Sequence, residues 1–104
     1  MRKKHNLEKI LNKMTTEKLN SILIVAKQNQ FGLRVARKLE KELKDKINEI
    51  HFDRSTALRF GKRGVSVKKF DGDLIITVGG DGTFLWTAQA VRRDVPILPV
   101  KIEG

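Results

Sequence analysis

The chain has 104 residues, a length that predicts a single domain. Hydrophobic residues make up 39%, enough for one modest core, and the absence of cysteine excludes disulfides and thiolate metal sites. No apolar run approaches the length of a membrane span, and the basic start MRKKHNLEKI lacks the apolar core of a secretory signal. We therefore expect a cytoplasmic protein without a membrane partner.

The formal net charge of +10 is unevenly distributed along the chain. The excess lies upstream of residue 71, since residues 71–104 carry about −2. A positive field attracts nucleic acids, and it equally attracts small phosphate-rich ligands such as ATP or a dinucleotide. The sequence has no aromatic-rich strand of the RNA-binding type and no recognition-helix pattern. We expect small phosphorylated ligands and no nucleic-acid partner.

The first half of the chain predicts a β-α-β unit behind a short helix over residues 6–19. The continuous apolar run 21–26 is typical of a strand buried on both faces of a parallel sheet. Residues 27–31 read as a polar turn. From Gly32 onward, apolar residues recur at helical spacing, namely Leu33, Ala36, Leu39, Leu43 and Ile47. Residues 49–53 alternate like a short strand, so a right-handed crossover and a parallel pair are expected.

Residues 54–69, RSTALRFGKRGVSVKK, predict a mobile basic connection in which Gly61 and Gly64 bracket Lys62-Arg63. Such a loop either contacts the phosphates of a bound nucleotide or is simply solvated, and the second alternative is the more common.

The second half continues the alternation of strands and helices. Residues 74–78 predict a third strand, followed by a helix to about Arg93, and residues 96–102 predict a fourth strand. Pro99 cannot donate to a ladder, so this strand should lie at a sheet edge or be bulged. The fold class predicted is α/β, a Rossmann-like open, mostly parallel sheet with helices on both faces. We assign residues 1–20 to an amino-terminal extension and residues 21–104 to the α/β phosphate-binding domain.

The most informative stretch is Gly79-Gly80-Asp81-Gly82-Thr83, between the third strand and the helix after it. Glycines let backbone N–H groups approach a ligand closely, and the start of a helix favours an anion. The turn is not the G-x-G-x-x-G dinucleotide fingerprint. A carboxylate among phosphates would repel them unless it holds a metal or accepts a proton from an attacking hydroxyl. The turn therefore indicates phosphoryl transfer, with Asp81 as the candidate catalytic residue.

An alternative for the same stretch is a hairpin, because Asp-Gly is also a common two-residue β-turn. The residues after the turn have the spacing of a helix and not the alternation of a strand. They are Phe84, Leu85, Ala88, Val91 and Arg92. Thr83 is predicted to cap that helix through its hydroxyl. The pattern thus favours a phosphate turn over a hairpin.

Gly79–Thr83, followed by Phe84-Leu85 and preceded by a strand, resembles the GGDGT signature of NAD kinases. The order of predicted elements over residues 21–104 is similar to the amino-terminal α/β domain of that family. The resemblance implies phosphorylation of the adenosine 2′-hydroxyl of NAD by ATP or polyphosphate, giving NADP. It also implies a divalent ion, Mg²⁺ by expectation, and a homo-oligomer when full length.

The family's site residues carry over position by position. Asp81 matches the general base or metal-organising carboxylate, and the metal ligands are otherwise not identified. Gly79, Gly80, Gly82 and Thr83 match phosphate contacts, and Phe84 matches a position near the dinucleotide. Leu85 matches another such position, with core packing as its alternative. Trp86 has no counterpart, and we expect it to be buried or to pack between domains.

The resemblance also has limits. The family continues with a β-rich domain that carries an Asn-Glu motif, and residues 1–104 do not include that domain. The stretch 99–104 matches the family loosely. We therefore expect a fragment that is inactive alone. Two alternatives stay open, namely another GGDGT-type kinase acting on diacylglycerol, sphingosine or a sugar phosphate, and a non-catalytic basic α/β binding module.

Overall fold

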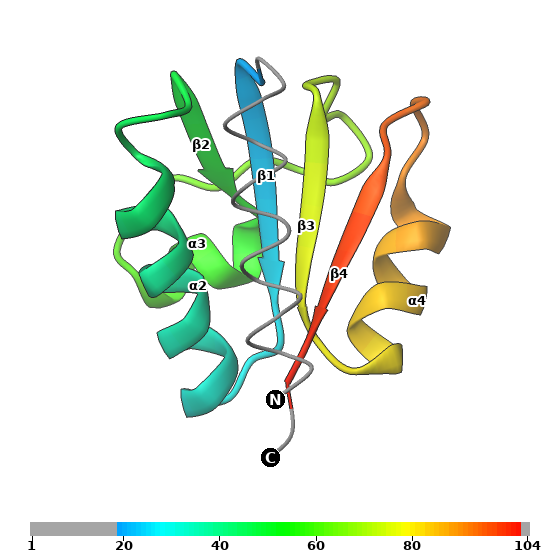
Figure 1. Ribbon diagram of the computed structural model, residues 1–104. Helices are drawn as coiled ribbons and strands as arrows, with labels where there is room; N and C mark the ends of the chain where they lie inside the picture. Colours follow the sequence, from blue (N-terminus) through cyan, green and yellow to red (C-terminus); the bar gives the residue numbers. More distant parts are fainter. Residues whose placement is uncertain (1–18, 103–104) are drawn as a thin grey trace.

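Four parallel strands form one sheet in the computed structural model, which describes residues 19–102. They are β1 (Ser21–Ala26), β2 (Glu49–Phe52), β3 (Leu74–Gly79) and β4 (Ile97–Lys101). They lie side by side in the order β2-β1-β3-β4, with all arrows pointing the same way (Figure 1). Residues 22–26 of β1 are buried, because β1 has a neighbour on each edge and cover on each face. This confirms the predicted α/β fold.

The helix after β1 is α2 (Gln30–Leu43), which starts and ends earlier than its apolar spacing predicts. It begins inside the predicted polar turn because Asn29 caps it, its Oδ1 accepting the Gly32 N–H at 2.7 Å. Ile47 is buried, yet it lies beyond the helix and joins the core from the loop. The apolar stripe thus identified the buried residues correctly and the helix boundary wrongly.

Two apolar clusters cover the two faces of the sheet. Alternate residues of β1 point to opposite faces, so Ile22 and Ile24 belong to one cluster and Leu23 and Val25 to the other. The first cluster receives α2, through Ala36, Leu39 and Leu43. The second receives the residues from 65 to 70, Val95 and the end of the last helix, α4 (Asp81–Ala90). Helices therefore flank the sheet on both sides, as predicted.

The segment 54–69, predicted as a mobile connection, is structured. It begins with α3 (Arg54–Arg59), and Val65 then forms a parallel bridge with Asp53. A Cβ on Gly64 would lie 2.5 Å from the Arg54 Cα, so this glycine permits the return of the chain against the start of α3. Val67 is buried in the second cluster. The structure of this segment could not be predicted from apolar spacing, because most of its residues are basic or polar and only a few apolar side chains pack into the core.

The ends of α4 and β4 refine the remaining predictions. The helix stops at Ala90, before the predicted Arg93, and Arg92 instead donates to the carbonyls of Gln89, Ala90 and Val91. This satisfies acceptors that a helix end leaves free. β4 is an edge strand, as Pro99 predicts. The helix predicted over residues 6–19 falls almost wholly outside the described residues.

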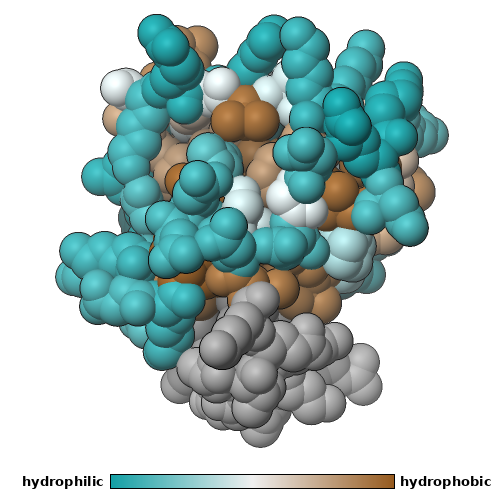
Figure 2. Space-filling model, turned by 90° about the horizontal axis from the view of Figure 1, so that it is seen from above, coloured by the Kyte–Doolittle hydropathy of each residue, from teal (hydrophilic) through white to brown (hydrophobic). Residues whose placement is uncertain are grey.

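The amino ends of the strands present a mainly hydrophilic surface with some apolar side chains between the polar ones (Figure 2). Within residues 19–102, no helix combines the length and apolarity that crossing a bilayer requires. At this end Asp73 joins two strands, because its Oδ2 accepts the backbone N–H groups of Asn20 (2.8 Å) and Ser21 (3.0 Å). These hydrogen bonds lower the pKa of the Asp73 carboxyl.

We predict that Asp73→Ala lowers the melting temperature at pH 7, because it removes the two side-chain hydrogen bonds that join the start of β3 to the start of β1. Since the folded pKa is lowered, this stabilisation is present above the ordinary pKa of 3.8 and is lost as the pH falls through the folded value. Thermal unfolding between pH 2 and 7 tests this. Asp71→Ala, at an exposed neighbouring carboxylate, is the control. Equal effects of the two substitutions at pH 7 would contradict the assignment.

Candidate functional site

The carboxyl ends of β1 and β3 form the point at which the chain leaves the sheet toward opposite faces. β1 leads to α2 on one face, and its neighbour β3 leads to α4 on the other. The Lys27 N–H donates to the Val78 carbonyl at 2.7 Å, which holds the two exits together. In open α/β sheets ligands bind at such a switch point. The predicted phosphate turn lies there.

The start of α4 offers free backbone donors. Its N-cap is Gly80, which has no side chain to fill the capping position, so the predicted Thr83 cap is wrong. The N–H groups of the first helical turn have no acceptor within a helix. These donors and the helix dipole both favour negative charge, so the start of α4 is a suitable position for an anion. The helix also excludes the hairpin alternative.

The three glycines of the turn serve different purposes. A Cβ on Gly79 would lie 2.5 Å from the Thr83 Oγ1 and 3.1 Å from the Lys27 Cβ, so packing requires glycine there. A Cβ on Gly80 or Gly82 would meet no atom within 4 Å, and neither residue has a positive φ. Among the described residues, neither packing nor backbone conformation explains these two glycines. Their exposed backbone is instead suited to close approach by a ligand.

Asp81 is the first residue of α4 and its side chain is 79% exposed. Its Oδ1 lies 2.9 Å from the Lys101 Nζ, at the end of β4. The position beside the helix start suits a carboxylate, and the lysine offsets part of its charge. Asp81 is therefore an accessible carboxylate next to free backbone donors, the arrangement predicted from the motif.

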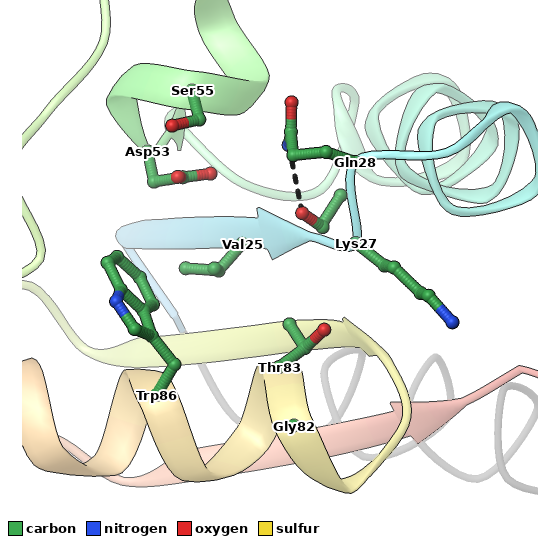
Figure 3. Close-up of a pocket in the computed structure, with 9 residues that line it drawn as sticks. Val25, Lys27, Gln28, Asp53, Ser55, Gly82, Thr83 and Trp86 are labelled. Atoms are coloured by element: carbon green, nitrogen blue, oxygen red, sulfur yellow. Dashed lines mark hydrogen bonds between the residues drawn. The ribbon is translucent and has the colours of Figure 1, made fainter.

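A cavity of about 280 Å³ opens between α3 and α4, over the carboxyl end of β1. Nine residues line it, namely Val25, Ala26, Lys27, Gln28, Asp53, Ser55, Gly82, Thr83 and Trp86 (Figure 3). Gln28 is fixed by its side-chain amide, which donates to the Ala26 carbonyl at 3.0 Å and to the Thr56 Oγ1 at 3.2 Å. The cavity thus adjoins the phosphate turn through Gly82 and Thr83. Asp81 lies on the other side of the turn, outside the lining.

Asp53 is the most unusual residue of this cavity. It follows β2, is 5% exposed, and its Oδ1 has no hydrogen-bond partner among the described residues. Its carboxylate points into the cavity (Figure 3). Burial raises the pKa of the Asp53 carboxyl, against the opposing effect of nearby donors on Thr56 and Ser55. Asp53 occupies the N-cap position of α3, and its Oδ1 is left as a buried acceptor that a ligand donor could satisfy.

A second cavity, of about 340 Å³, continues along α4 and shares Asp53, Ser55 and Trp86 with the first. Its remaining lining is Arg54, Ser66, Val67, Lys68 and Ala90. Arg54 and Lys68, from the segment 54–69 that was predicted as a loop, thus line a cavity. Lys62 of the same segment instead pairs with Glu40. Trp86 is 54% exposed, which excludes burial within this chain, whereas packing between domains stays a prediction.

Two further predicted residues lie apart from both cavities. Phe84 is half-buried and lines neither, so its predicted place near the dinucleotide stays a prediction. Leu85 is 55% exposed, which excludes the alternative of core packing.

A divalent ion would find a single carboxylate at the turn. Within residues 19–102, no three metal-ligating side chains gather as a dedicated metal cage. Mg²⁺ in phosphoryl-transfer sites is commonly held by one or two carboxylates together with substrate phosphates and water. Asp81, exposed beside a phosphate turn, fits that mode of binding.

The turn Gly79–Thr83 could be predicted from the sequence, whereas the opposite wall of the cavity was not predicted. Gln28 follows β1, whereas Asp53 and Ser55 lie at the end of β2 and the start of α3, and no local motif joins the two segments. The available signal was positional, because Asp53 follows a strand whose carboxyl end lies at the same edge as the turn. In dinucleotide-binding folds an acidic residue at the end of the second strand accepts a ribose hydroxyl.

Comparison with known proteins agrees with this geometry. Residues 4–103 match the family described as ATP-NAD kinase N-terminal domain. The chain is 37% identical over 69 residues to an NAD kinase of Methanoculleus marisnigri, covering 66% of this chain and 26% of the relative. It is 30% identical over 84 residues to NAD kinases of Thermococcus sibiricus and Pyrococcus furiosus, covering 77% of this chain and 30% of each. The chain therefore spans between a quarter and a third of these curated relatives.

We predict that Gly79→Ala destabilises the fold by about 1–3 kcal/mol, because the new methyl group displaces the Thr83 hydroxyl. Gly80→Ser should not destabilise the fold, since its Cβ meets no atom and serine is favoured at the N-cap position that Gly80 occupies. Urea denaturation of both variants measures the difference. Equal losses from the two substitutions would show that Gly80 is also required by packing.

We also predict a pH-dependent difference in stability between the native chain and Asp53→Asn. Because the folded pKa of Asp53 is raised, the native state binds more protons than the unfolded state above pH 3.8. The stability of the native chain relative to Asp53→Asn should therefore fall as the pH rises from about 4 through the folded pKa, and then level off. Melting temperatures of both proteins from pH 4 to 8 test this. A constant difference across the range would rule out a buried, titrating Asp53.

Proposed function

Because this chain belongs to the NAD kinase family, we propose that it provides the phosphate-binding part of an enzyme that converts NAD to NADP. The phosphoryl group comes from ATP or polyphosphate, and the acceptor is the adenosine 2′-hydroxyl of NAD. We include in the proposal a cytoplasmic location, with which the cysteine-free sequence is compatible. The division into an extension (1–20) and a phosphate-binding domain (21–104) is likewise proposed.

One observation supports this proposal above all others. An exposed carboxylate, Asp81, stands beside the free N–H groups at the start of α4, on a turn whose glycines Gly80 and Gly82 leave the backbone open. A phosphate binds to the backbone donors, and a hydroxyl that approaches the phosphate meets the carboxylate. A turn used only for structure would have no need of both features.

The proposed reaction assigns one step to each group. The 2′-oxygen forms a bond to the transferred phosphorus while the bond from phosphorus to the leaving phosphate oxygen breaks. Asp81 accepts the hydroxyl proton as the new bond develops. The first-turn N–H groups of α4 hold the phosphates in line and offset their charge. When bound, a divalent ion neutralises further charge on the phosphates.

Lys101 acts on Asp81 and not on the substrate in this proposal. Its ammonium lies 2.9 Å from the carboxylate and is itself 62% exposed. By offsetting the charge of Asp81, it reduces the repulsion between the carboxylate and a nearby phosphate. It also restricts the side chain of Asp81 to the side of the helix start that faces β4.

We predict that Asp81→Asn lowers the rate of NADP formation at least about 100-fold, because the amide cannot accept the hydroxyl proton. The protein to use is the complete gene product that contains this chain, assayed with NAD and either ATP or polyphosphate. Stability should change by less than about 0.5 kcal/mol, since the side chain is largely exposed. Asp94→Asn, at another exposed carboxylate, is the matched control.

The same assay separates the alternatives. Diacylglycerol, sphingosine and a sugar phosphate should not be phosphorylated under conditions in which NAD is. Turnover of NAD that is unchanged in Asp81→Asn would favour a structural role for the glycine turn. Phosphorylation of one of the other acceptors in place of NAD would assign a different GGDGT-type kinase activity.

A further inference from the structure

The wall of the cavity opposite the phosphate turn is not used by the proposed reaction. It holds Asp53, whose Oδ1 is buried and unpartnered among the described residues, and Ser55. Across the cavity from them lies the indole of Trp86, on α4 (Figure 3). Asp53 also occupies the N-cap position of α3, but this leaves its buried Oδ1 without a partner. An inward-pointing free acceptor and an exposed aromatic ring that face each other are features of a ligand site.

The order of these groups along α4 matches the order of groups in a nucleotide. Gly82 and Thr83 lie at the helix start, where a phosphate would bind. Trp86 is about one helical turn, or roughly 5.4 Å, further along the axis. Asp53 faces the space between from the other wall (Figure 3). Phosphate, sugar and base would therefore meet an N–H cradle, a carboxylate and an aromatic ring in turn.

We propose that this cavity is a nucleoside subsite in which a ribose hydroxyl donates to Asp53 and the base stacks on Trp86. The inference rests on the proposed function, and it adds the residues that recognise the nucleoside. The ligand class is a ribonucleotide, which in the proposed reaction is either the phosphate donor or the adenosine half of NAD. Arg54 and Lys68, in the adjoining cavity, contribute a positive field that attracts such a ligand.

Simpler ligands fit the cavity less well. Inorganic polyphosphate would satisfy the start of α4, but it has no donor for Asp53 and no ring for Trp86. An apolar ligand would leave the Asp53 oxygen without a partner. A nucleotide satisfies all three groups, and the two cavities together continue far enough along α4, from Gly82 to Ala90, to accept its base.

Trp86 is the only tryptophan of the chain, so its fluorescence reports directly on this subsite. The experiment titrates the 104-residue chain with ADP, NAD, tripolyphosphate, and the 2′-deoxy and 3′-deoxy forms of ADP. We expect ADP, NAD or both to quench the fluorescence and tripolyphosphate to leave it unchanged. Because ADP is also the adenosine diphosphate part of NAD, quenching by ADP without a response to NAD assigns the subsite to the phosphate donor. Quenching by NAD, with or without a response to ADP, assigns it to the acceptor.

Asp53 accepts a hydrogen bond from one ribose hydroxyl of the nucleotide. A ligand that lacks this hydroxyl should bind about tenfold more weakly or worse, because a hydrogen bond to a charged group is lost. Where NAD alone quenches, NAD lacking one hydroxyl of its adenosine ribose replaces the deoxy forms of ADP. Asp53→Ala, which has no side-chain acceptor, should bind the ribose and deoxyribose ligands with similar affinity, whereas Asp94→Ala should still discriminate as the native chain does. Circular dichroism verifies that each variant is folded, and the deoxy ligands test the native chain without any substitution.

The inference is overturned if no nucleotide changes the fluorescence of Trp86, or if the native chain binds ribose and deoxyribose forms equally. This failure differs from failure of the proposed function, which the complete gene product reports through NADP. NADP formation without a Trp86 response would leave the reaction standing and remove the nucleoside subsite. If the fluorescence of Trp86 responds to a nucleotide in a way that depends on the ribose hydroxyl, but no NADP forms, the nucleoside subsite stands and the proposed reaction is wrong.

Discussion

The parallel pairing of β1 with both β2 and β3 is the constraint on which the rest of the structure depends. It buries β1 on every side and brings three strand ends to one edge of the sheet. Because the chain leaves β1 and β3 toward opposite faces, the start of α4 and the end of β2 face each other across that edge. The cavity and the phosphate turn are consequences of this topology.

Two aspartates at opposite ends of the sheet show how stability and function are separated. Asp73, at the amino end, accepts two backbone N–H groups, and its pKa is lowered. Asp53, at the carboxyl end, is buried with one unpartnered oxygen, and its pKa is raised. The first carboxylate holds strands together. The second costs stability at the edge where ligands bind, which is where unsatisfied groups in folded proteins tend to have a function.

β1 and β3 could be predicted because each is a nearly continuous apolar run, and β2 because its polar and apolar residues alternate. The turn could be predicted because its glycines and Asp81 are contiguous. Boundaries were harder to predict. Asn29 started α2 early and Gly80 took the capping position expected of Thr83, since caps depend on local geometry that apolar spacing does not record. α3 was not predicted, because a six-residue helix among basic residues has too few apolar positions to show the periodicity of a helix. The wall around Asp53 is assembled by tertiary contacts, which no local pattern contains.

Amide chemical shifts show most directly whether the backbone at the start of α4 binds phosphate. The ¹⁵N-labelled chain is titrated with tripolyphosphate and followed at every assigned amide. We expect the largest shifts at Asp81, Gly82 and Thr83, whose N–H groups begin the helix. Shifts confined to the basic outer face of α2, around Arg37, Lys41 and Lys44, with the turn unaffected, would contradict this expectation.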